Sequence, residues 1–163
     1  MKRIIRDAKV VEDRWSIVTS DDVAEFVLPQ GDAKLILPLD LHIALQQAAL
    51  PTGASQRLGL FLGPGDAAED VLPFLAQLPI IAVHFPAFTD GRGYSIGRLI
   101  RMRHGFAGEL RAVGDILRDQ LYFLNQCGFN AFDLRPDQDI EEALAAFGDY
   151  AWATRRSSHA GDR

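Results

Sequence analysis

The chain contains a single cysteine, Cys127, among its 163 residues. One cysteine excludes an internal disulfide, and the lack of a CxxC pair or a cysteine cluster excludes a cysteine-held iron–sulfur or zinc site. Long apolar runs are also missing, so no segment approaches a transmembrane span, and the basic start leads into no signal-like apolar stretch. We therefore expect a cytoplasmic protein without membrane contact, in which any redox role would need a borrowed cofactor.

An excess of positive charge is missing as well. Lys and Arg number 17 against 22 Asp and Glu, which gives a net charge of -5 and a pI near 5.3. Because nucleic-acid phosphates are bound by concentrated basic surfaces, this balance argues against a general nucleic-acid-binding protein. The hydrophobic content of 48% and charged content of 24% are typical of a globular protein, and the length fits one domain.

What the chain does have is an alternation of strand-like and helix-like segments. Residues 1–34 are β-rich around the turn-prone Thr19–Asp22, and we expect them to form a small antiparallel hairpin or edge element. Residues 35–155 are typical of an α/β domain, and residues 156–163 are expected to be a flexible tail. Five strands are predicted in the α/β domain, at residues 35–40, 57–63, 80–85, 110–113 and 129–134.

Each predicted strand is followed by a helix-like segment. We expect these helices at residues 41–49 and 69–78, from about residue 94, after Asp115 and after Asp139, with Asp66, Asp115 and Asp139 as caps and Gly128 as a stop. Repeated βα units predict a mainly parallel sheet, either open and doubly wound or an incomplete barrel-like arc. We favour the open sheet, with an arc closed by dimerisation as the alternative. Exposed sheet edges also make a homodimer plausible.

Charged residues follow the strands at 80–85, 109–114 and 129–134, where the carboxyl ends of parallel strands form a ligand crevice. The sequence DGRGYS has the parts of an anion cradle for sulfite, sulfate or phosphate: flexible glycines, a following helix N-terminus and an arginine. Its residues are Asp90, Gly91, Arg92, Gly93, Tyr94 and Ser95. The structural alternative is a tight turn in which Asp90 or Ser95 caps the helix and Arg92 pairs with Asp90 or Asp115.

Further candidates lie on the same strands. His84, Asp90 and Asp115 are candidate catalytic acids or bases, and Arg111, Asp133 and Arg135 are candidate ligand-binding residues. For each, the alternative is a structural hydrogen bond or ion pair. The scattered histidines predict no metal site. A dinucleotide site is a weaker candidate, because the glycines of GRGYSIG stand too far after the strand.

Residues 90–132, DGRGYSIGRLIRMRHGFAGELRAVGDILRDQLYFLNQCGFNAF, resemble an uncharacterised bacterial family. The run FPAFTDGRGYS, followed by GELRAVGD and RDQL, is the most specific part, and the resemblance extends from LILPLD to the final helix. Members of that family are described as probable oxidoreductases involved in sulfite reduction and are typically encoded beside the sulfite reductase haemoprotein. The resemblance implies a place in assimilatory sulfur metabolism rather than a particular reaction.

Two functional classes follow. In the first, the chain is an accessory protein that binds sulfite reductase, or a sulfur oxyanion or nucleotide intermediate. In the second, it is a small enzyme acting on an anionic substrate with a borrowed nucleotide or flavin cofactor, in which Arg92 and Arg111 bind the anion and His84, Asp90 or Asp115 moves protons. The sequence names no cofactor, and the lack of a full cofactor fingerprint favours the accessory protein.

Overall fold

Eight strands form one sheet in the computed structural model, of which residues 1–19 and 25–148 are described here. Five of them, β4 to β8, correspond to the five strands expected from the sequence. The strands are β1 (Arg3–Arg6), β2 (Lys9–Glu12), β3 (Trp15–Ile17), β4 (Lys34–Pro38), β5 (Leu58–Leu62), β6 (Ile80–Phe85), β7 (Glu109–Gly114) and β8 (Ala131–Phe132).

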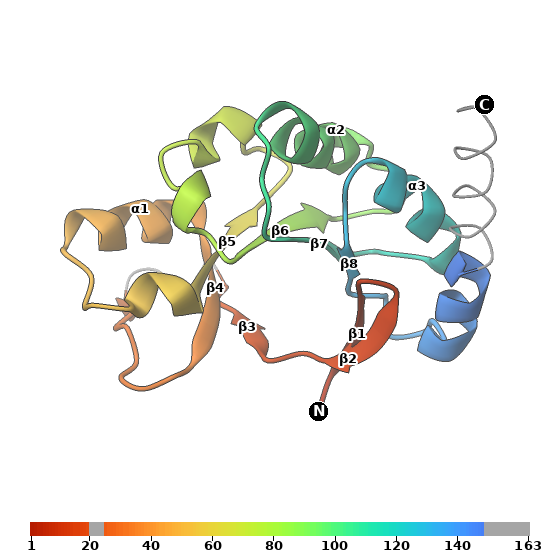
Figure 1. The fold of residues 1–163 in the computed structure, drawn as a ribbon, viewed down its shortest axis with the longest axis horizontal. Coiled ribbons are helices and arrows are strands. Elements are labelled where there is room, and N and C mark those ends of the chain that lie inside the picture. The colour runs from red at the N-terminus through yellow and green to blue at the C-terminus, as the bar shows by residue number, and fades with distance from the viewer. Residues whose placement is uncertain (20–24, 149–163) are drawn as a thin grey trace, which may run out of the picture.

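The sheet is curled into a half-barrel (Figure 1). Its strand order is β2-β1-β8-β7-β6-β5-β4-β3. Neighbours from β3 to β8 are parallel, whereas β1 is antiparallel to both β2 and β8. The two edge strands, β2 and β3, are joined through Asp13 and Arg14 alone. The barrel-like arc is therefore the observed alternative, in place of the open doubly wound sheet that we favoured.

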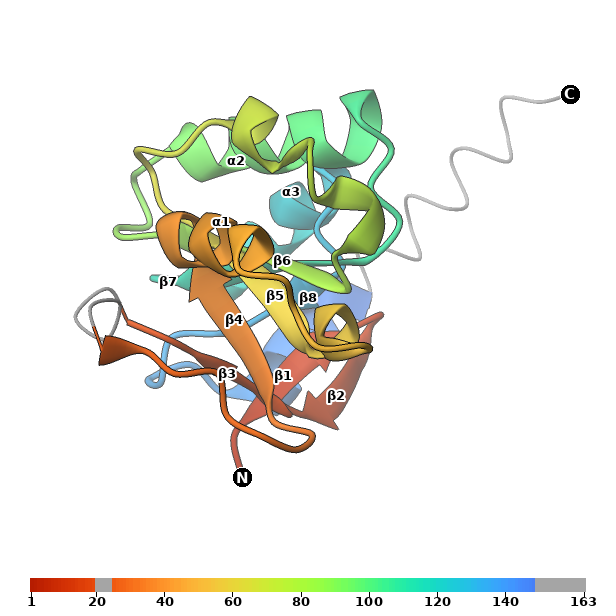
Figure 2. The ribbon, with the colours of Figure 1, turned by 90° about the vertical axis from the view of Figure 1, so that its left-hand side faces the viewer.

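The helices lie on the convex side of the sheet (Figures 1 and 2). They are α1 (Leu39–Gln47), α2 (Arg92–Arg98) and α3 (Leu121–Gln126), and residues 140–148 are also helical. A π-helical turn, Leu99–Arg103, continues α2. The main hydrophobic core lies between these helices and the sheet. A second, smaller cluster fills the concave side, where Trp15 and Phe61 pack against residues of the inner sheet face.

The prediction of a helix at residues 69–78 is wrong. Two short 3-10 turns, Ala68–Val71 and Leu75–Gln77, stand in its place. Pro73 lies between them, and its missing N–H removes a hydrogen bond that a continuous α-helix requires. Asp66 does not cap this segment, because its carboxylate accepts the backbone N–H of Gly63 at 2.8 Å and holds the turn after β5.

Two other helix ends follow the sequence and one does not. Asp139 caps the last helix by accepting the Glu142 N–H at 3.0 Å, and Gly128 follows α3 with a φ of 103°. Asp115 caps no helix, since α3 begins six residues later and its carboxylate instead accepts the Phe88 N–H.

The N-terminal hairpin exists, but its turn is not the one expected. β1 and β2 are joined at Asp7 and Ala8, whose φ angles are 51° and 60°. Positive φ at both central residues is characteristic of a type I′ hairpin turn. Such turns usually contain Asn-Gly or Asp-Gly, so the Asp-Ala pair did not predict one. β3 then pairs in parallel with β4 rather than forming a hairpin. Residues 20–24 and the expected tail at 156–163 lie outside the described residues.

Burial of His42 on α1 makes stability depend on pH. His42 is 3% exposed, and its ring packs against that of Phe74 with centroids 5.0 Å apart. Its Nδ1 has no hydrogen-bond partner among the described residues. Burial lowers the pKa of His42 below its ordinary value of 6.5, because the low-dielectric surroundings disfavour the charged ring.

We therefore expect the free energy of unfolding to fall as pH drops below 6.5, since the unfolded chain then binds protons that folded His42 does not. Above 6.5 both states are neutral and this dependence disappears. Urea unfolding of the wild type and His42→Leu at pH 7.5, 6.5 and 5.5 measures the effect. The variant should lose less stability between pH 6.5 and 5.5, and equal losses would contradict the assignment.

Candidate functional site

The carboxyl ends of β6, β7 and β8 meet at Asp115, the first residue after β7. One carboxylate oxygen accepts the backbone N–H of Phe88, in the loop after β6, at 2.9 Å. The other accepts Nη1 of Arg135, in the loop after β8, also at 2.9 Å. The three strand ends that the βαβαβ pattern places at one edge are therefore joined by a single carboxylate.

The charges at this edge neutralise one another. Arg135 donates to Asp115 and also to both oxygens of Asp137, from Nε at 2.6 Å and Nη2 at 2.7 Å. The Phe88 N–H, followed by Arg135, lowers the pKa of Asp115, and Arg135 lowers that of Asp137. Both carboxyls are thus ionised at neutral pH and already accept hydrogen bonds from the protein.

The DGRGYS segment contains its own ion pair. Arg92 donates to Asp90 from Nη2 at 2.7 Å, from Nε at 3.1 Å and from its backbone N–H at 3.0 Å. These bonds, chiefly the side-chain ones, lower the pKa of Asp90 to about 2. Arg92 thus pairs with Asp90, as in the structural alternative to an anion cradle. Asp90 is charged across the physiological pH range.

The remaining DGRGYS residues are placed mainly by packing. A side chain on Gly93 would approach the Phe85 ring to less than 3.0 Å, whereas one on Gly91 would meet no atom within 4 Å. The Tyr94 hydroxyl accepts a hydrogen bond from Gln120 Nε2 at 2.9 Å, and Ser95 is exposed. Gly93 thus allows close contact between α2 and β6, which is a structural reason for this glycine.

The other three sequence candidates, His84, Arg111 and Asp133, lie on the concave face of the sheet. His84 is half-buried beside Phe61, with ring centroids 5.4 Å apart, and burial lowers its pKa. Asp133 accepts a hydrogen bond from Lys2 Nζ at 2.6 Å. These residues therefore face the inside of the half-barrel, on the other side of the sheet from the helices.

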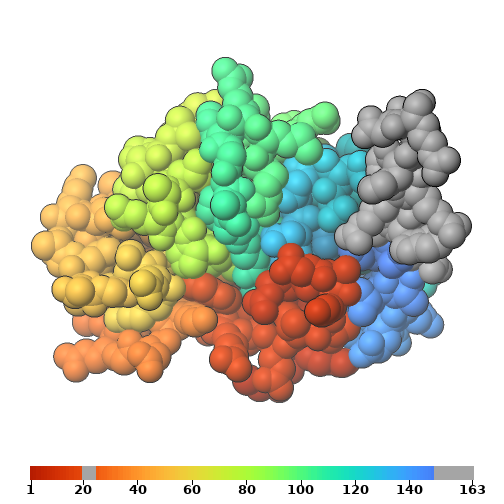
Figure 3. Space-filling view, in the orientation of Figure 1, coloured from red at the N-terminus to blue at the C-terminus, as the bar shows by residue number. Residues whose placement is uncertain are grey.

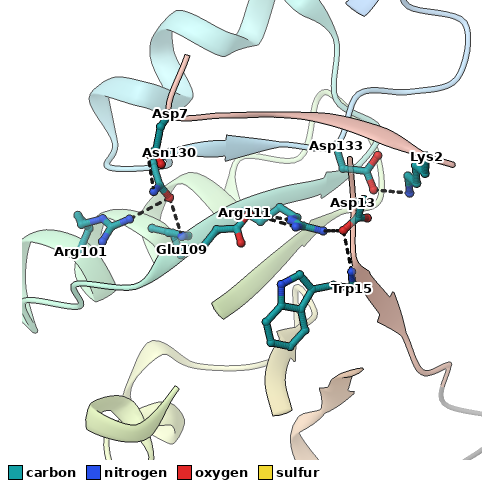
Figure 4. A network of polar contacts seen from close by, with 10 residues as sticks. Lys2, Asp7, Asp13, Trp15, Arg101, Glu109, Arg111, Asn130 and Asp133 are labelled. Atoms are coloured by element: carbon teal, nitrogen blue, oxygen red, sulfur yellow. Dashed lines mark hydrogen bonds and ion pairs between the residues drawn. The ribbon is translucent and has the colours of Figure 1, made fainter. Parts of the chain in front are cut away.

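Arg111 is 1% exposed and forms the centre of a buried network (Figure 4). Its Nη1 donates to Asp13 Oδ1 at 2.9 Å, and its Nη2 and Nε donate to Glu109 Oε1 at 3.1 and 3.3 Å. Asp13 also accepts the Trp15 backbone N–H. Arg111 thus ties the link between the two edge strands to the middle of the sheet.

Two phenylalanines are exposed beside the strand ends, whereas aromatic residues that flank a buried strand are usually found in the core. Phe88 is 51% exposed and Phe123, on α3, is 54% exposed. The ring of Tyr94 lies 5.0 Å from that of Phe123, and Gln120 Nε2 donates both to the Tyr94 hydroxyl and to the Phe88 carbonyl, the latter at 3.3 Å. We call Phe88, Tyr94 and Phe123 the aromatic surface.

Other parts of the described chain offer less. No group of three or more His, Cys, Asp or Glu side chains in residues 1–19 and 25–148 is placed to hold a metal ion. Within the same residues, no helix has the length and apolarity to cross a membrane. A pocket of about 800 Å³ lies between the end of α1 and residues 27–32, and none of the predicted site residues lines it.

Comparison with known proteins finds one family. Residues 59–160 match the model of a family described as bacterial protein of unknown function, DUF934. The match begins in β5 and so contains the strand ends, the aromatic surface, α2 and α3, but neither the N-terminal hairpin nor Asp13. No curated protein matches the chain.

Proposed function

The chain belongs to the DUF934 family, and from this premise we propose that it is an accessory protein of sulfite reduction that binds another protein. The aromatic surface carries the proposal. The link to sulfite reduction comes from the resemblance of residues 90–132 to proteins encoded beside sulfite reductase, whose haemoprotein is the proposed partner in the cytoplasm.

Phe88 and Phe123 are 51% and 54% exposed, and a partner that covers them removes apolar surface from water. Full burial of one such side chain stabilises by roughly 1.5–3 kcal/mol. Gln120 fixes the Tyr94 hydroxyl and the Phe88 backbone through hydrogen bonds, and the Phe123 ring packs against that of Tyr94. Aromatic side chains, phenylalanine included, are enriched at protein–protein interfaces relative to the rest of the surface.

The charges at the strand ends give less support to the alternative, an enzyme that acts on an anion. Arg92, Arg111 and Arg135 each already donate to carboxylates, so an anion would have to displace them. Asp90 and Asp115 have lowered pKa values, which makes them weak bases near neutral pH. The paired charges hold loops together, so the aromatic surface is the feature of this edge that favours binding of a partner.

Binding of the purified chain to the sulfite reductase haemoprotein of the same bacterium tests the proposal. We expect a dissociation constant in the micromolar range or below, measured by calorimetry, and a loss of about tenfold or more with Phe123→Ser. Val27→Ser is the matched control, because Val27 is 82% exposed and far along the chain from the aromatic surface. No complex with the wild type, or an equal loss with the control, would reject the proposal. A self-associating wild type would instead identify a homodimer.

A further inference from the structure

One segment of this acidic protein contains arginines but no acidic residue. Residues 91–108 contain four arginines and no aspartate or glutamate, whereas the whole chain has a net charge of -5. The segment comprises α2, the π-helical turn and the loop that leads to β7. Its arginines are Arg92, Arg98, Arg101 and Arg103.

The four arginines have different surroundings. Arg92 is paired with Asp90. Arg101 is half-buried and donates to the carbonyls of Gly128 and Phe106 and to Asn130 Oδ1. Arg98 and Arg103 are exposed and form no ion pair with any residue in the described part of the chain.

An apolar side chain lies between these two free charges in the sequence. Met102 is 56% exposed, while the opposite side of the helix, at Gly93, Ile96, Gly97 and Ile100, is buried. We call Arg98, Met102 and Arg103 the basic ridge. The segment around residue 100, green in Figure 3, protrudes from the molecule in that view.

The basic ridge continues the aromatic surface. Tyr94 on α2 touches Phe123 on α3. Arg98 follows Tyr94 by four residues, and Cys127 follows Phe123 by four residues. Burial raises the pKa of the Cys127 thiol, and the positive charge of Arg98 partly offsets this effect. Residues four apart lie on one side of a helix, so Arg98 extends the side of α2 that carries Tyr94.

We infer that the basic ridge docks an acidic protein surface, with Met102 packed at the centre and Arg98 and Arg103 paired with carboxylates of the partner. This inference rests on the proposed function and names the chemistry of the partner's surface. Free guanidinium groups beside exposed apolar side chains fit an interface with an apolar centre and a charged rim. Two exposed arginines on a net-negative protein supply few of the phosphate contacts on which nucleic-acid affinity depends.

The test is binding to the sulfite reductase haemoprotein at 50 and 300 mM NaCl. We compare the wild type with the double variant Arg98→Glu, Arg103→Glu and with the control Lys9→Glu, Arg14→Glu, which changes the net charge equally at exposed positions of the hairpin and its link to β3. The wild-type complex should weaken at high salt. The ridge variant should bind about tenfold or more weakly at 50 mM NaCl, and the control should stay within about twofold.

The outcomes separate the two proposals. If the haemoprotein binds the wild type and the ridge variant equally well, the ridge inference is overturned and the proposed function stands. If the haemoprotein does not bind, the proposed function fails, and a 20-residue polyglutamate peptide then tests the ridge. Binding of this peptide that is lost in the ridge variant supports the inference. No such binding, or tighter binding of a 20-nucleotide single-stranded DNA, overturns it.

Discussion

We expect Arg111→Ala to lower the free energy of unfolding by about 3–5 kcal/mol, as is usual when one partner of a buried ion pair is removed. The variant leaves the carboxylates of Asp13 and Glu109, which are 5% and 10% exposed, without their cation. It also frees the link between β2 and β3 from the middle of the sheet. Urea unfolding at pH 7 measures the loss.

Arg118→Ala is the matched control for this loss. Arg118 also has two acidic neighbours, Glu142 at 3.3 Å and Asp119 at 3.9 Å, but its side chain is 52% exposed. Exposed pairs contribute about 0–1 kcal/mol. If Arg111→Ala does not fold, Arg111→Lys keeps the positive charge and should unfold at an intermediate urea concentration. Equal losses for Arg111→Ala and Arg118→Ala would show that burial of the network has no energetic consequence.

Truncation of Phe129 to alanine should cost about 3–5 kcal/mol, the usual range for a fully buried phenylalanine. Phe129 is 0% exposed, its ring lies 5.8 Å from that of Phe85, and it fills the space beneath Gly97 of α2. The ring therefore joins the sheet to α2. Urea unfolding and the thermal midpoint give the loss.

The same contact predicts a coupling between Phe129 and Gly97. A Cβ on Gly97 would approach the Phe129 ring to less than 3.0 Å, so Gly97→Ala should cost about 1–3 kcal/mol in the wild type. It should cost clearly less in the Phe129→Ala background, where the ring is absent. Gly91→Ala is the control, since its Cβ would meet no atom within 4 Å. Additive losses at Gly97 and Phe129 would argue against the contact.

The parallel strands could be predicted because they leave a local signal. β6 is a nearly continuous apolar run, as expected of a strand covered on both faces, and the segments after it alternate between strand-like and helix-like patterns. The curl of the sheet leaves no such signal. The curled sheet brings together Asp13 and Arg111, which are 98 positions apart in the chain, and one sequence does not reveal a pairing over that distance.

In the candidate site, too, local pairings could be predicted from the sequence, and contacts between distant segments could not. The pairing of Arg92 with Asp90 was one of the alternatives, and the Glu109–Arg111 pair was open to prediction because residues two apart on a strand share a face. Asp115 and Arg135 were placed at one edge for a topological reason, and they do meet. The contact between Tyr94 and Phe123 could not be foreseen, because these residues lie on different helices and meet only when α2 and α3 pack together.

The pairing of β1 with β8 has a consequence for the order in which the protein is completed. Ile5 and Arg6 pair with Phe132 and Ala131, so β1 is synthesised long before its partner strand β8. An isolated hairpin is marginally stable at best in water. Ile5 is 0% exposed in the folded protein. Until β8 has been synthesised, one of the two strands that pair with β1 at Ile5 is missing. A chain that ends before β8 therefore leaves one edge of β1 unpaired and the apolar side chain of Ile5 exposed, which favours aggregation.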